Sequence, residues 1–160
     1  MHDMHKLPTI HEMLRDLVRS PSVSSVDAAV DSGNHAVAEM LGDWARNLGM
    51  SVEVLPLPNA PGKSNLIATL GSGDDGLVLA GHTDTVPYDA HRWHYDPFEP
   101  TQVENRIYGL GTTDMKGFFP LVLAAISQFL TPIRTSLGVP TPCVPGRCGR
   151  PRIRRRNGSA

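Results

Sequence analysis

The apolar run Leu77-Val78-Leu79-Ala80 restricts the fold of this chain more than any other feature of its sequence. Every side chain in it is apolar, so a strand built from it would need cover on both faces. Strands of this kind lie in the middle of sheets with helices on both sides, whereas a strand with one face in water alternates apolar and polar residues. The run therefore predicts an α/β fold with a central strand over residues 77–81.

Helical periodicity precedes this run. Apolar residues at the i, i+3, i+4, i+7 spacing predict one helix that starts near Thr9 and ends before Pro21, and a second that starts at an Asn34 cap and ends at Gly49. The other expected elements are strands around residues 52–54 and 66–70 and a helix over residues 115–130 with a proline in its first turn.

His82 and Asp84 follow the apolar run directly. Because side chains two residues apart on a strand share a face, the imidazole and the carboxylate are expected to project together from the carboxyl end of the strand, where open α/β sheets place their sites. An imidazole suits zinc, and a nearby carboxylate can hold its other ring nitrogen. The pair predicts half of a metal site, although a simple capped loop would also explain it in isolation.

A second segment, Tyr-Gly-Leu-Gly-Thr-Thr-Asp-Met-Lys-Gly over residues 108–117, supplies another carboxylate, Asp114. The third glycine of a dinucleotide fingerprint would fall at position 114, so nucleotide binding is not predicted. Together, the two segments resemble the metal-binding core of the aminoacylase and acetylornithine deacetylase family of two-metal amidohydrolases. The resemblance covers residues 6–130.

This resemblance implies a fold and a set of roles. Residues 1–130 would be the N-terminal part of a zinc-metallopeptidase-like catalytic domain, with a mixed sheet flanked by helices. Two divalent ions, zinc or cobalt, would be bound, with His82 as a ligand of one, Asp114 bridging both and Asp84 orienting His82. A shared carboxylate offsets the repulsion between ions about 3.5 to 4 Å apart. The peptide between Asp114 and Met115 is expected to be cis, as in the family.

The implied reaction is the hydrolysis of an N-acyl amide, with N-acetylornithine of arginine biosynthesis as the expected substrate. A succinyl-diaminopimelate desuccinylase or a peptidase stays open, because these relatives share the metal residues. The family's Glu-Glu pair, which includes the general base, would fall near residues 144–147, where the chain reads Val-Pro-Gly-Arg. Its later ligands and the domain that forms the family homodimer have no counterpart here. The chain itself is therefore expected to be truncated and inactive.

Other conspicuous side chains receive no metal role. His91 and His94 match no ligand of the family, so solvent exposure is expected for both. Trp93 between them either packs the loop or lines a path for substrate. Lys116 either tunes the field near the second segment or is simply solvated.

Charge divides the chain at residue 130. Residues 1–130 carry 8 Lys and Arg and all 16 Asp and Glu, whereas residues 131–160 carry 7 Arg and no acid. The second part is rich in Pro, Gly and Arg without apolar periodicity, which predicts a disordered tail that resembles a frameshifted reading of the gene. Its Cys143 and Cys148 do not have the spacing of a metal knuckle.

The non-catalytic alternative is a module that binds an acidic partner through this basic tail. No aromatic residue interleaves its arginines, so nucleic acid is not an expected partner. No apolar run approaches the roughly 18 residues needed to cross a bilayer, and the first residues lack the apolar core of an export signal. A membrane partner is therefore not expected, and the cytoplasm is the expected location.

Overall fold

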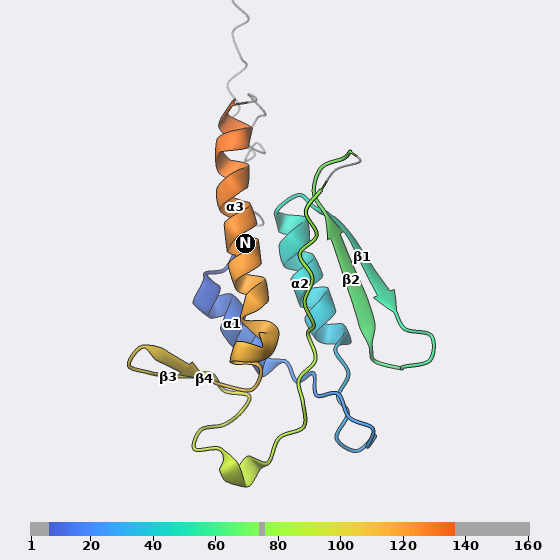
Figure 1. Ribbon diagram of the computed structural model, residues 1–160, viewed down its shortest axis with the longest axis vertical. Coiled ribbons are helices and arrows are strands. Elements are labelled where there is room, and N and C mark those ends of the chain that lie inside the picture. Colours follow the sequence, from blue (N-terminus) through green and yellow to red (C-terminus); the bar gives the residue numbers. More distant parts are fainter. Residues whose placement is uncertain (1–6, 74–75, 137–160) are drawn as a thin grey trace, which may run out of the picture. The chain divides into compact units, whose positions relative to one another are not determined.

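A computed structural model describes residues 7–73 and 76–136 (Figure 1). The expectations for Cys143, Cys148 and the rest of residues 137–160 lie outside these residues and stay predictions. The chain divides into two compact units, Met1–Ser127 and Gln128–Ala160. The first unit holds all the side chains of the candidate site.

Helix α1 (Ile10–Arg19) starts and ends where the sequence predicts, and it begins with a capping box at Thr9. The Thr9 hydroxyl accepts the backbone N–H of Glu12 at 3.3 Å, and the Glu12 carboxylate accepts the backbone N–H of Thr9 at 2.8 Å. These bonds satisfy amide groups that the first turn of a helix leaves without an intrahelical acceptor. The inner face of the helix is buried through Met13, Leu17 and Val18.

Replacing Thr9 with alanine is expected to lower the free energy of unfolding by about 1 kcal/mol, because the capping hydroxyl is lost. Thr9→Ser keeps the hydroxyl and serves as the matched control. Urea denaturation followed by circular dichroism measures both variants. Equal midpoints for wild type and Thr9→Ala would contradict a stabilising role for the cap.

Helix α2 (His35–Asn47) packs against a hairpin formed by β1 (Ser51–Pro56) and β2 (Ser64–Thr69). The strands are antiparallel, with Val52 opposite Ala68. Gly42 allows a close approach, since a Cβ there would lie 3.2 Å from the Val52 Cγ1 atom. The buried face of the helix includes Val37, Ala38, Leu41, Trp44 and Ala45. The second predicted helix and the first two predicted strands are confirmed.

Residues 77–81 do not form the expected central strand. They run as extended chain, and Leu77 and Val78 are 84% and 86% exposed (Figure 1). No backbone hydrogen bond joins residues 77–81 to another part of the described chain. The physical reason is that a strand forms only where a neighbouring strand supplies backbone hydrogen bonds. The two described sheets are separate two-stranded hairpins, and neither includes residues 77–81.

The second sheet leads into the segment that carries Asp114. Strands β3 (Thr101–Val103) and β4 (Arg106–Tyr108) pair antiparallel, and the chain then passes through Gly111, which has a φ of +81°. Only glycine adopts this backbone conformation without strain. A tight turn, η2 (Thr112–Lys116), follows, in which Asp114 and Met115 have non-helical backbone angles. The peptide between Asp114 and Met115 is cis, as expected.

Helix α3 (Phe118–Ser136) has Pro120 in its first turn, as predicted. It extends beyond the expected end at Leu130, so residues 131–136 of the expected tail are helical. None of the helices in the described part of the chain is both long and apolar enough to cross a membrane.

Candidate functional site

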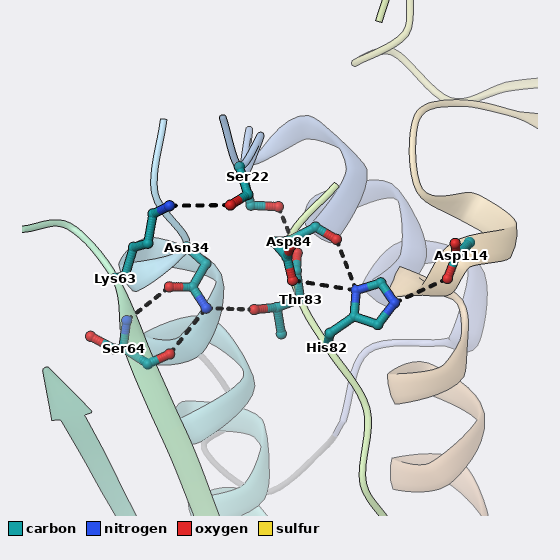
Figure 2. Close-up of polar contacts among 9 residues, drawn as sticks. Ser22, Asn34, Lys63, Ser64, His82, Thr83, Asp84 and Asp114 are labelled. Carbon is teal, nitrogen blue, oxygen red and sulfur yellow. Dashed lines mark hydrogen bonds and ion pairs between the residues drawn. The ribbon is translucent and has the colours of Figure 1, made fainter. Parts of the chain in front are cut away.

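His82 lies between two aspartates (Figure 2). Its Nε2 atom is 3.0 Å from Oδ1 of Asp114. Its Nδ1 atom is 3.1 Å from the backbone oxygen of Asp84 and 3.4 Å from Oδ1 of the same residue. The fold thus brings the three sequence-predicted site residues together, although residues 77–81 form no strand.

The carboxylates change the protonation of the imidazole. Partial burial by itself lowers the pKa of His82, but the hydrogen bonds to Asp84 and Asp114 and the charges of both residues outweigh it, so the pKa lies above its usual value of 6.5. The side chains of His82 and Asp84 are 49% and 50% exposed, and that of Asp114 is 83% exposed. Water therefore screens these interactions, and the three side chains are accessible to an ion from solution.

An open cavity of about 630 Å³ adjoins the three residues. Trp93 lines it, which favours the substrate-path interpretation of this residue over loop packing alone. His91 and His94 are exposed, as expected, and do not line the cavity. Within the described residues, Asp84 and Asp114 are the only carboxylates in the cavity wall.

The donor set is incomplete for a metal site. Over residues 7–73 and 76–136, no group of three or more His, Cys, Asp or Glu side chains is arranged to hold one ion. A catalytic zinc site uses three protein ligands and a structural one uses four. His82 and Asp114 could supply two of them.

The segment after α1 holds the loop that carries His82. The backbone N–H of Thr85 donates to the Ser22 carbonyl at 2.9 Å, and the Ser24 N–H donates to the Thr85 carbonyl at 2.8 Å. The Ser22 hydroxyl donates to the Thr83 carbonyl at 2.7 Å. These three bonds fix the backbone on the carboxyl side of His82.

Asn34 supports the same loop from the other side. It occupies the N-cap position of α2 as predicted, but its side chain forms no capping bond, so that part of the prediction is wrong. Its amide instead donates to the Thr83 hydroxyl at 2.7 Å and to the Ser64 carbonyl at 3.0 Å (Figure 2). The side chain thus connects the loop to β2 rather than to its own helix.

Lys116 is buried, with 1% of its surface exposed, so the solvated interpretation is wrong. Its Nζ atom donates to the Leu17 carbonyl at 2.9 Å and to the Ser20 carbonyl at 2.7 Å. Burial lowers the pKa of its ammonium group to about 8. Sequence reasoning could not find these contacts, because both acceptors are backbone groups more than ninety residues earlier in the chain.

Comparison with solved structures identifies the class of fold. Human carnosine dipeptidase 1 superposes with a TM-score of 0.66 at 26% identity, covering 78% of this chain and 28% of that one. The M20 family metallo-carboxypeptidase Sso-CP2 from Sulfolobus solfataricus gives a TM-score of 0.65 at 22% identity, over 80% and 28% of the two chains. The predicted α/β fold of the metallopeptidase type is confirmed.

Sequence comparison narrows the class to a family. Residues 78–136 match the model of Peptidase family M20/M25/M40. The acetylornithine deacetylase of Proteus mirabilis (strain HI4320) is 52% identical over 126 residues, 79% of this chain and 33% of that protein. That of Pasteurella multocida (strain Pm70) is 49% identical over 125 residues, 78% and 33% respectively. Residues 78–136 thus match the M20/M25/M40 family model, and the chain spans about a third of the length of the curated relatives it matches.

Proposed function

We propose that this chain supplies His82 and Asp114 as ligands of a divalent ion in the site of an amide hydrolase, with Asp84 orienting His82. The observation that carries the proposal is the imidazole of His82, which has one aspartate at each ring nitrogen and opens on a cavity. Similarity to acetylornithine deacetylases supports N-acetylornithine as the substrate, with ornithine and acetate as products. The cytoplasm and a homodimer of the complete enzyme belong to the same proposal.

The residues fit zinc or cobalt in their chemistry. Imidazole nitrogen and carboxylate oxygen are both ligands of these ions. Such an ion would polarise the acyl carbonyl and lower the pKa of a water molecule. Asp84 holds the Nδ1 side of the ring, which leaves Nε2 directed toward Asp114, where the ion would be shared.

The described residues do not complete this chemistry. Two ligands fall short of the three that a catalytic zinc site uses, and the described cavity wall offers no carboxylate beyond Asp84 and Asp114 to serve as a general base. The proposal is therefore that the chain by itself binds a divalent ion weakly and does not turn over N-acetylornithine. In the family reaction its residues would act together with ligands and a base from elsewhere.

Calorimetric titration with zinc at neutral pH tests the metal site. Weak binding is expected in the wild-type chain, and it is expected to vanish in His82→Ala. His94→Ala removes an exposed imidazole outside the cavity and is the matched control, which should bind like wild type. Binding that survives His82→Ala but not His94→Ala would overturn the assignment. A tight, stoichiometric site at His82 would show that the chain completes its donor set.

A further inference from the structure

The two halves of the candidate site share one anchor, which we define as residues 17–24 and call the anchor segment. Through Ser22 and Ser24 it holds the loop that follows His82. Through the carbonyls of Leu17 and Ser20 it holds Lys116 in the turn that carries Asp114. His82 and Asp114 are therefore each tied to one short piece of chain at the end of α1, in addition to their own direct contact.

We propose that Lys116 is a positioning residue that, together with Ser22, sets the separation between the His82 imidazole and the Asp114 carboxylate. The inference deepens the proposed function, since it concerns the same two side chains. It assigns a purpose to a buried lysine that does not line the cavity and whose ammonium group bonds to backbone carbonyls rather than to either aspartate.

The chemistry of the contact suits a rigid link. The last carbonyls of a helix have no intrahelical donor and carry partial negative charge, so a cation is favoured there. Lys116 supplies its ammonium group to one such carbonyl, that of Leu17, and to the carbonyl of the C-cap residue Ser20, and its own backbone N–H donates to the Gly111 carbonyl at 2.8 Å. The lysine thus closes the η2 turn at its base and fastens that turn to α1. Removing the ammonium leaves the buried Leu17 carbonyl and the partly buried Ser20 carbonyl without this donor, which is costly.

The contact between Gly81 and Met115, next to the candidate ligands, can report the separation between His82 and Asp114. A Cβ built on Gly81 would lie 3.0 Å from the Cε methyl of Met115 and 3.0 Å from the Phe118 ring. Gly81 precedes His82 and Met115 follows Asp114, so the distance between these neighbours follows the distance between the candidate ligands. No metal ion is needed to measure it.

The test uses the isotope-labelled full chain, free of metal, in solution. In the wild type, a nuclear Overhauser effect is expected between the Gly81 α-protons and the Met115 methyl group. In Lys116→Met, which keeps the aliphatic stem and removes the ammonium, this signal is expected to be lost while the resonances of α2 and the β1–β2 hairpin persist. Persistence of the signal in folded Lys116→Met would overturn the proposal.

Two further variants separate positioning from stability. Val37→Ala removes core volume in α2 and leaves the hydrogen bonds of Ser22 and Lys116 in place, so it should lower stability while keeping the signal. Loss of the signal in folded Val37→Ala would mean that any destabilisation erases it, and would refute a specific role for Lys116. If Lys116→Met does not fold, Ser22→Ala decides, because it removes only the bond to Thr83; a signal of wild-type strength there would contradict the shared anchor.

Cobalt titration of the wild type is read separately. If cobalt does not bind but the nuclear Overhauser effects follow the expected pattern, the metal assignment of His82 and Asp114 is wrong and the positioning role of Lys116 stands. If cobalt binding depends on His82 but the signal is unchanged in folded Lys116→Met, the metal assignment stands and the positioning role of Lys116 is wrong.

Discussion

Gly33→Ala is expected to lower the free energy of unfolding by about 3 kcal/mol. Gly33 has a φ of +67°, and a Cβ there would lie 2.3 Å from the Gly62 carbonyl oxygen. The left-handed conformation costs an alanine roughly 1 to 2 kcal/mol, and relieving an overpacked contact costs about 1 to 3 kcal/mol more. That carbonyl also accepts the N–H groups of Asn34 and His35, so it cannot move without disturbing the start of α2.

Gly71→Ala is the matched control for this substitution. Gly71 has a φ of +83°, but a Cβ there would meet nothing within 4 Å. It should therefore lose only the conformational part, about 1 to 2 kcal/mol. Thermal and urea denaturation of the two variants measure the difference. Equal losses would show that the Gly33 and Gly62 backbones separate at no cost.

The second large effect concerns the candidate metal ligands. Asp114→Ala is expected to abolish measurable cobalt binding, because it leaves His82 as the only candidate ligand among the described residues. Asp84→Asn keeps the backbone oxygen that faces the His82 Nδ1 atom and alters only the charge beside it. Such a change next to a ligand weakens metal affinity by about 10- to 100-fold without removing the ion's contacts.

Visible absorption of cobalt, titrated into each variant, distinguishes the two roles. Equal loss of binding in Asp114→Ala and Asp84→Asn would assign Asp84 to the ion directly and overturn its orienting role. Undiminished binding in Asp114→Ala would remove that residue from the site altogether.

Much of this fold could be predicted because its signals are local. The periodic apolar residues of α1 and α2 and the alternation in β1 depend on neighbours a few positions away, and all three elements form where expected. The proximity of His82, Asp84 and Asp114 was predictable as well, since the two segments resemble a family whose site unites them. The local argument paired His82 with Asp84 through a strand that does not form, whereas the family resemblance united all three residues without depending on that strand.

What could not be predicted depends on distant partners. The run at residues 77–81 has the composition of a central strand. A strand also needs a partner strand from elsewhere in the chain, and none of the described segments pairs with this run. Asn34 was expected to cap its own helix, and its amide instead bonds Thr83 and Ser64. Lys116 donates to the carbonyls of Leu17 and Ser20, which lie more than ninety residues earlier, and no sequence pattern predicts contacts over such a separation.

The exposed run at residues 77–81 also has a bearing on how long the chain survives. Apolar side chains next to open backbone donors and acceptors form a template onto which another polypeptide can add. Such a surface favours self-association, which grows with concentration. It also favours early binding by chaperones and cleavage by proteases. The lifetime of this chain in a cell would then be decided by a segment that takes no part in its chemistry.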